Sequence, residues 1–252
     1  MIMVNDSLTS LRASPTWGLP SDPHMQTAQF KLNLEGDDQV SALVMRPAQA
    51  HSMYVFAHGA GAGMTHSFME EVAIALAARG IATLRFNFPF METLAGKRWA
   101  RTDSPKVAQA AVRAAVRAAG ALAPDLPLFA GGKSFGARMT SQMQAEGIEP
   151  NVRGLVFIGY PLHLANKPSL KRAQHLPLVQ LPMLVLQGTR DSLARSDLLE
   201  ATCAPLPLAH LHWIEGADHA FDVLVRSGRT HADVVDEIAD AVTAWIKARL
   251  VE

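Results

Sequence analysis

Short apolar runs alternate with helical patterns along most of this chain, and this alternation constrains the fold more than any other feature. Compact apolar runs at residues 52–57, 81–86 and 128–131 have the length of buried strands. Between the first two runs, apolar residues at helical spacing from Phe68 to Arg79 predict a helix that Gly80 ends. Strand–helix–strand repetition of this kind is typical of βαβ units in a mostly parallel sheet.

The same reading extends over the rest of the chain. We expect strands at residues 29–34, 40–45, 52–57, 81–86, 128–131, 155–158, 183–186 and 208–214, and helices at residues 68–79, 105–119, 135–146 and about 234–246. A turn at residues 35–38 would join the first two strands into an antiparallel hairpin. The prediction is an α/β fold with a sheet of about eight strands and helices on both faces.

Composition limits the kinds of partner, the domain organisation and the location that we expect for this chain. Apolar residues make up 49% of the 252 residues, and 23 basic side chains balance 23 acidic ones, so we expect neither a nucleic-acid nor a membrane partner. Residues 1–25, rich in Ser, Pro and Asp, are expected to form an irregular arm, and residues 26–252 a single domain. The arm lacks the pattern of a signal peptide, and the single cysteine, Cys203, permits no internal disulfide; both favour a cytoplasmic location.

The sequence G-K-S-F-G at residues 132–136 matches the motif G-x-S-x-G. A strand-like run at residues 127–131 precedes it, and a helical pattern at residues 137–143 follows it. A serine on such a strand-to-helix turn has its hydroxyl exposed above the sheet, which makes Ser134 the candidate nucleophile. The alternative is a glycine-rich turn with a solvated serine.

A serine hydroxyl needs a base to activate it and an acid to orient that base. Asp191 follows the buried run at residues 183–186, and His219 follows the last expected strand, so both come where strands end. Their order after Ser134 is the order of hydrolases with this kind of turn. Asp191 could instead cap a helix, and Asp197 and Asp218 are the rival acids.

Other polar residues receive weaker interpretations. His210 and His212 alternate along one strand and could be a metal pair, but no third ligand is apparent, so a solvated edge strand is favoured and no metal or cofactor is expected. His163 follows a strand end and could line the pocket. We expect Lys133 to point away along its strand, without a role, and residues 88–91 to approach the site. Two loop arginines, Arg98 and Arg101, could meet an anionic substrate but are more typical of solvated side chains.

The glycine-rich sequence at residues 58–63 follows the third expected strand. Acyl transfer requires two amides aimed at the developing oxyanion, one after the nucleophile and one from this loop. We assign them to the N–H groups of Phe135 and Ala60, with Gly61 as the alternative to Ala60. The loop matches neither of the common glycine-rich nucleotide-binding motifs.

Three segments resemble one group within the α/β-hydrolase superfamily: H-G-A-G-A-G-M-x-H-x-F-M at residues 58–69, R-F-N-F-P-F at residues 85–90 and G-G-K-S-F-G-A-R-M at residues 131–139. The group comprises small, dienelactone-hydrolase-like bacterial proteins, and it is similar to a eukaryotic testis-expressed protein and to a regulatory subunit of a chromatin complex, the NSL complex. Dienelactone hydrolases proper have a cysteine nucleophile where this chain has serine. The resemblance implies an α/β-hydrolase fold and a triad of Ser134, Asp191 and His219.

These observations lead to two hypotheses about function. The first is a serine hydrolase that cleaves carboxylic esters of small molecules through an acyl-Ser134 intermediate. The second, motivated by the chromatin-complex relative, is a non-catalytic interaction module on a hydrolase scaffold. Because residues 162–181 are too few for a large helical cap and contain prolines, we expect a minimal lid and an open site.

Overall fold

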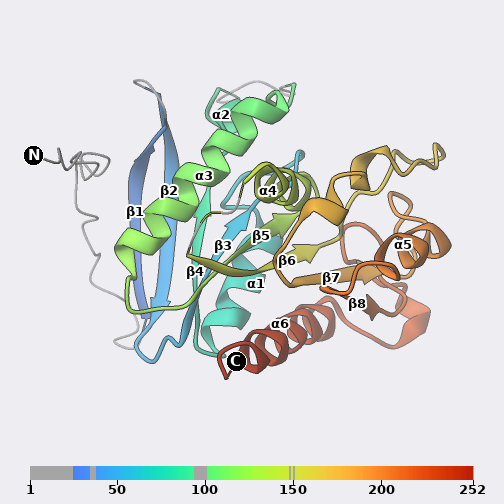
Figure 1. The fold of residues 1–252 in the computed structure, drawn as a ribbon. Helices are drawn as coiled ribbons and strands as arrows, with labels where there is room; N and C mark the ends of the chain where they lie inside the picture. Colours follow the sequence, from blue (N-terminus) through green and yellow to red (C-terminus); the bar gives the residue numbers. More distant parts are fainter. Residues whose placement is uncertain (1–24, 35–37, 94–100, 148, 150, 252) are drawn as a thin grey trace, which may run out of the picture.

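A twisted sheet of eight strands runs through the molecule, and helices cover both of its faces (Figure 1). The computed structural model describes residues 25–34, 38–93, 101–147, 149 and 151–251. The order of the described strands is β1-β2-β4-β3-β5-β6-β7-β8. β2 is antiparallel to both of its neighbours, β1 and β4, and all the other neighbouring pairs are parallel. The predicted fold class is therefore confirmed.

The strands are β1 (Met25–Asn33), β2 (Gln39–Pro47), β3 (Ser52–Ala57), β4 (Ile81–Phe86), β5 (Leu128–Lys133), β6 (Val152–Ile158), β7 (Met183–Gly188) and β8 (Ala209–Ile214). The helices are α1 (Ser67–Ala77), α2 (Pro89–Glu92), α3 (Pro105–Leu122), α4 (Phe135–Glu146), α5 (Ser196–Cys203) and α6 (His231–Ala248). Three short 3-10 helices also occur, η1 (Lys171–Ala173), η2 (Leu176–Leu178) and η3 (Val225–Ser227). Of the arm expected at residues 1–25, residues 1–24 lie outside the described residues, as does most of the turn at residues 35–38. Met25, the last residue of the expected arm, is instead the first residue of β1, because it pairs with Pro47 of β2.

The helices bury two separate apolar clusters against the two faces of the sheet. On one face, α3, α4 and α5 pack residues such as Val112, Met139 and Leu199 against the strands. On the other face, α1 and α6 pack residues such as Val72 and Ile238. Figure 1 shows α3 and α4 on the opposite side of the strands from α1 and α6. This layering is the usual way in which a parallel sheet keeps both faces out of water.

Parallel strands place their carboxyl ends at one edge of the sheet. The loops that leave β3, β5, β7 and β8 therefore begin at the same edge. Open α/β sheets bind ligands at such an edge. Ser134, Asp191 and His219 all lie in these connections.

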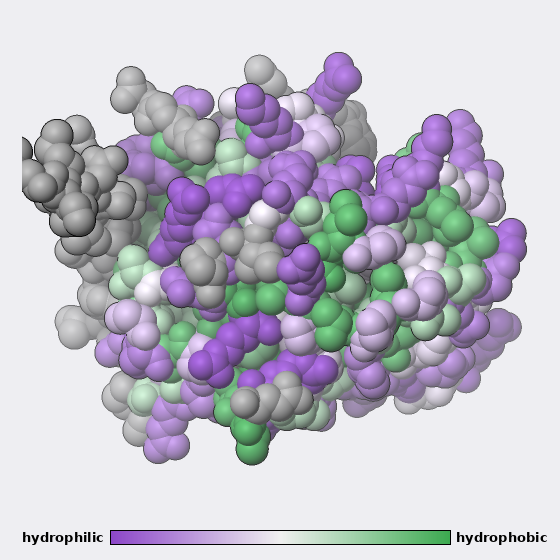
Figure 2. Space-filling view, in the orientation of Figure 1, coloured by the Kyte–Doolittle hydropathy of each residue, from purple (hydrophilic) through white to green (hydrophobic). Residues whose placement is uncertain are grey.

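The surface carries polar and apolar residues interspersed over the face seen in Figure 2. None of the helices in the described part of the chain combines the length and the apolar character needed to cross a membrane.

Several element boundaries differ from the sequence prediction. α3 continues through Gly120 to Leu122, whereas the sequence predicts that it ends at Gly120. The buried stripe of α3 extends to Ala119, and this packing holds the last turn in spite of the glycine. β6 begins at Val152, three residues earlier than predicted, and α2 is a short helix that the sequence does not signal.

The two glycines near helix ends provide a test of this difference. Gly80 has a φ of +81°, and a Cβ there would lie 2.9 Å from Cδ2 of His51, whereas a Cβ on Gly120 would meet nothing closer than 3.9 Å. Gly120→Ala should therefore raise the free energy of unfolding by about 0.5–1 kcal/mol, as alanine does inside a helix. Gly80→Ala should lower it by about 1 kcal/mol or more. Urea denaturation of both variants measures this, and a destabilised Gly120→Ala would mean that the helix ends where the sequence predicts.

Candidate active site

Ser134 occupies a strained turn between β5 and α4. Its φ of 51° and ψ of −109° lie outside the regions that non-glycine residues favour, a conformation that costs about 1–3 kcal/mol. The glycines on either side of it permit close packing, because a Cβ on Gly132 or Gly136 would lie 2.4 or 2.5 Å from the carbonyl oxygen of Ala57. The motif G-x-S-x-G thus meets a steric requirement of this turn.

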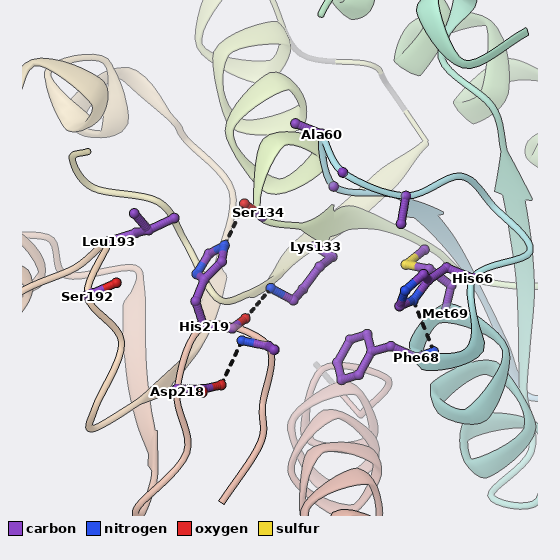
Figure 3. Close-up of a pocket in the computed structure, with 14 residues that line it drawn as sticks. Ala60, His66, Phe68, Met69, Lys133, Ser134, Ser192, Leu193, Asp218 and His219 are labelled. Carbon is purple, nitrogen blue, oxygen red and sulfur yellow. Dashed lines mark hydrogen bonds between the residues drawn. The ribbon is translucent and has the colours of Figure 1, made fainter. Parts of the chain in front are cut away.

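The structure brings Ser134, His219 and Asp191 together in a chain of hydrogen bonds. Oγ of Ser134 lies 2.9 Å from Nε2 of His219, as Figure 3 shows. Nδ1 of His219 lies 2.6 Å from Oδ2 of Asp191. Since an ionised carboxylate only accepts hydrogen bonds, Nδ1–H donates to Asp191, and Nε2 is then free to accept the hydroxyl proton of Ser134.

The carboxylate of Asp191 is buried and held from two further directions. Its Oδ1 accepts a hydrogen bond from the backbone N–H of Leu193 at 2.7 Å. Its Oδ2 also accepts one from Nε2 of Gln187 at 2.5 Å. Gln187 is not among the site residues expected from the sequence. A signal for it exists, because a polar residue directly after four apolar residues of a buried strand is itself buried and needs a hydrogen-bond partner.

The rival acids have other partners. Asp197 lies in α5, is exposed, and pairs with Arg195. Oδ1 of Asp218 accepts the backbone N–H groups of Ala220 and Asp222 and so closes the turn that carries His219. Within the described structure, Asp191 is thus the acid that contacts the His219 ring.

The three other histidines considered in the sequence, His163, His210 and His212, lie away from Ser134. His163 is buried; its Nδ1 donates to the carbonyl of Leu164, and its Nε2 accepts the backbone N–H of Arg195. It therefore braces the loop after Asp191 and does not line the pocket. His210 and His212 lie on β8, an edge strand, as expected. Among the described residues, no group of three or more His, Cys, Asp or Glu side chains could hold a metal ion.

The two loops proposed for the oxyanion lie beside Ser134. Phe135 is the first residue of α4, where backbone N–H groups have no partner inside the helix. Gly59, Ala60 and Gly61 line the same pocket as Ser134, and a Cβ on Gly59 would be 3.6 Å from Cβ of Ser134. The structure thus places Ala60 and Gly61 beside Ser134, and the assignment of one of their amides to the oxyanion stays a prediction.

The segment at residues 85–88 fixes this loop at both ends. Nη1 of Arg85 donates to the carbonyl of Met64 at 3.1 Å, and Oδ1 of Asn87 accepts the N–H of the same residue at 2.9 Å. The N–H of Phe88 donates to Nε2 of His58 at 3.0 Å. The sequence at residues 85–90 therefore contacts both ends of the loop at residues 58–64, which we call the oxyanion loop after its predicted role.

Phe88 and Phe90 approach the site, as expected, but from beneath the loop. Their rings pack edge-on against Phe135, with centroids 5.1 and 5.9 Å away. Arg98 lies outside the described residues, so the expectation for it stays a prediction. Arg101 is exposed, as expected for a solvated loop arginine.

A pocket of about 650 Å³ opens at Ser134 between the oxyanion loop, the start of α1 and the loops after β7 and β8. Most of its lining is apolar; its residues are Gly59, Ala60, Gly61, Ala62, His66, Phe68, Met69, Lys133, Ser134, Ser192, Leu193, Asp218, His219 and Ala220. The connection at residues 162–181 contains only η1 and η2 as helical elements, so the lid is minimal, as predicted.

Lys133 differs from its prediction. Its side chain does not point away without a partner: Nζ donates to the carbonyl oxygen of His219 at 2.6 Å (Figure 3). Burial lowers the pKa of Lys133 to about 8.

The one cysteine, Cys203, is buried away from this pocket, and burial raises the pKa of its thiol to about 11, as suits an unreactive structural thiol.

Solved structures with similar folds are hydrolases. A dienelactone hydrolase from Anabaena variabilis has a TM-score of 0.72 at 21% identity, covering 90% of this chain and 99% of that one. Est1E from Butyrivibrio proteoclasticus, solved with ferulic acid bound, has a TM-score of 0.70 at 14% identity, covering 88% and 100%. XC6422 from Xanthomonas campestris, described as an α/β serine hydrolase without a lid, has a TM-score of 0.64 at 22% identity, covering 90% and 96%.

At these identities the likeness establishes the fold. A family model goes further, because it matches residues 50–247, a range that includes Ser134, Asp191 and His219. The chain belongs to the alpha/beta hydrolase domain family.

Proposed function

We propose that this protein is a serine hydrolase that cleaves carboxylic esters of small molecules. The observation that carries the proposal is the chain of hydrogen bonds from Ser134 through His219 to Asp191, at the mouth of an apolar pocket. A nucleophile bonded to a base, which is bonded in turn to a buried orienting group, is the arrangement that acyl transfer requires.

In the first half-reaction, Oγ of Ser134 attacks the ester carbonyl carbon while Nε2 of His219 accepts the hydroxyl proton. Asp191 orients the ring and stabilises the imidazolium that forms. The N–H groups of Phe135 and of Ala60 or Gly61 donate hydrogen bonds to the carbonyl oxygen and stabilise the negative charge that develops on it. Collapse of the tetrahedral intermediate breaks the bond to the alcohol, which leaves with the proton from His219 and yields acyl-Ser134.

In the second half-reaction, water replaces the alcohol. The water oxygen attacks the acyl carbon while His219 accepts one proton of that water. His219 then returns the proton to Oγ of Ser134 as the bond from Oγ to the acyl carbon breaks and the carboxylic acid leaves. These steps use only the residues already described, and the proposal invokes no cofactor.

The pocket favours small, neutral acyl groups. Phe68 and Met69 form an apolar wall, and the ammonium of Lys133 is engaged by the His219 carbonyl. A minimal lid leaves the site open, as expected for short substrates rather than for long buried chains. A panel of p-nitrophenyl esters of increasing acyl length, together with a thioester and a peptide amide, would define the leaving group and acyl size that the enzyme accepts.

The nucleophile is tested by covalent labelling. A fluorophosphonate probe should label the wild-type chain at Ser134 and leave Ser134→Ala unlabelled, because the probe reacts with an activated serine. Intact-protein mass spectrometry measures the adduct. A folded wild-type chain that takes up no probe would reject the hydrolase and favour the alternative of a non-catalytic interaction module.

The role of Asp191 is tested by a matched pair of substitutions. Asp191→Asn preserves the shape of the side chain but removes the negative charge that orients His219, so we expect the labelling rate and kcat to fall by about a thousandfold or more. Asp197→Asn, at the exposed rival position, should leave both unchanged. Equal losses in the two variants would contradict the assignment.

The oxyanion loop depends on a neutral His58. Its ring is buried, and burial lowers its pKa to about 4; Nδ1–H donates to the carbonyl of Gly59, and Nε2 accepts the N–H of Phe88. The ordinary pKa of histidine is 6.5, so below that value the unfolded chain binds a proton that the folded chain does not, and stability falls as the pH drops toward 4.

The lowered pKa of His58 predicts that this residue alone reduces the free energy of unfolding by about 2 kcal/mol when the pH falls from 7 to 5. His58→Gln keeps an acceptor for Phe88 but does not titrate, so its stability should fall by about that much less over the same interval. His210→Gln, at an exposed position on β8, is the control. Urea denaturation at both pH values measures the difference, and identical pH dependence in wild type and His58→Gln would contradict the linkage.

A further inference from the structure

Lys133 lies at the base of the Ser134 pocket, on the opposite face of the sheet from α4, and is largely buried there. It is 9% exposed, and its Nζ lies 5.2 Å from the ring centroid of Phe221 and 5.9 Å from that of Phe68. A Cβ on Gly159 would approach Nζ to 3.1 Å, so the glycine makes room for the ammonium. Aromatic faces and one carbonyl oxygen thus replace most of the water around this charge.

The carbonyl that receives the ammonium belongs to His219. This residue sits in a tight turn in which the N–H of Phe221 donates to the carbonyl of Asp218, and Phe221 itself has a positive φ of 69°. The charged groups that face Lys133 are Asp191 and Asp218, both of which favour its protonated form. The Lys133 side chain therefore ties the backbone of this turn to the end of β5, the strand that leads into Ser134.

We propose that Lys133 is a positioning residue that fixes the backbone of His219 relative to Ser134. The inference rests on the proposed function, in which Nε2 of His219 must receive the proton of Ser134. Ser134 follows Lys133 directly in the chain, so the hydrogen bond from Nζ to the His219 carbonyl links base and nucleophile over a short path. A displacement of about 1 Å between reacting groups can cost about a hundredfold in rate.

A positioning role for Lys133 can be distinguished from a role in stability because its ammonium is buried. Burying a charge costs free energy of folding, so replacing a buried charged side chain by an apolar one of similar volume often leaves the stability unchanged or raises it. Lys133→Met keeps an unbranched apolar stem that is one atom shorter, but it loses the donor and the charge. If Lys133 positions His219, the variant should lose activity without a matching loss of stability.

The test compares wild type with Lys133→Met and with Tyr54→Phe. The control is matched, because the hydroxyl of Tyr54 also donates, at 3.0 Å, to a backbone carbonyl on this face of the sheet, that of Val156, within the strands and away from Ser134. The measurements are the rate of fluorophosphonate inactivation, kcat and KM for p-nitrophenyl acetate, and the melting temperature.

We expect Lys133→Met to lower kcat and the inactivation rate by about tenfold or more, with KM within about threefold of wild type. Tyr54→Phe should retain full kcat. Lys133→Gln, which retains a neutral donor, should lie between Lys133→Met and wild type, and it also serves if the methionine variant does not fold.

Two results would overturn the inference. The first is a folded Lys133→Met, or Lys133→Gln in its place, with kcat within about twofold of wild type. The second is a loss of kcat in Tyr54→Phe as large as that in Lys133→Met, which would assign the effect to general destabilisation. A wild-type chain that is not labelled would instead refute the proposed function, and the positioning role with it.

Discussion

The contact between the carbonyl of Ala57 and the two glycines that flank Ser134 is the constraint on which the rest of the site depends. It brings the end of β3, the end of β5 and the first turn of α4 within a distance that no side chain larger than hydrogen permits. The loop after Ala57 therefore starts beside the nucleophile, and Gly59 and Ala60 line the same pocket as Ser134. Two features keep Ser134 in its strained backbone conformation. One is this close packing against Ala57, and the other is the pairing of β5 with β3 on one side and with β6 on the other.

From this contact, the two faces of the sheet support different parts of the site. On the side of α3 and α4, Phe88 and Phe90 pack beneath Phe135 and support the oxyanion loop. On the side of α1 and α6, Phe68 and Phe221 enclose Lys133 beneath the turn of His219. In the proposed mechanism, the first face positions the N–H groups that donate hydrogen bonds to the oxyanion, and the second positions the base that transfers the proton.

Much of this arrangement is predictable from the sequence, because it lies in local patterns. Apolar runs and helical periodicity predict the sheet, and the positions of Asp191 and His219 after strands predict that they reach the same edge as Ser134. Gly80 lies in the turn that follows the end of α1 at Ala77, and its positive φ is a local property that glycine permits. Gly120 does not end α3, since tertiary packing of the alanine stripe outweighs the low helix propensity of glycine.

The supporting contacts are not predictable in the same way, because they join residues distant in the chain. The partner of Lys133 lies 86 residues away, and His58 meets Phe88 across 30 residues. No periodicity indicates such a pair, and only the unusual residue types at residues 85–90 and before the nucleophile hint that a partner exists.

The most direct measurement is a crystal structure of the fluorophosphonate adduct. The account predicts a tetrahedral phosphorus bonded to Oγ of Ser134, with one phosphonyl oxygen within hydrogen-bond distance of the N–H of Phe135 and of the N–H of Ala60 or Gly61, and with His219 still bonded to Asp191. An adduct on another residue, or a phosphonyl oxygen directed away from those amides, would contradict it.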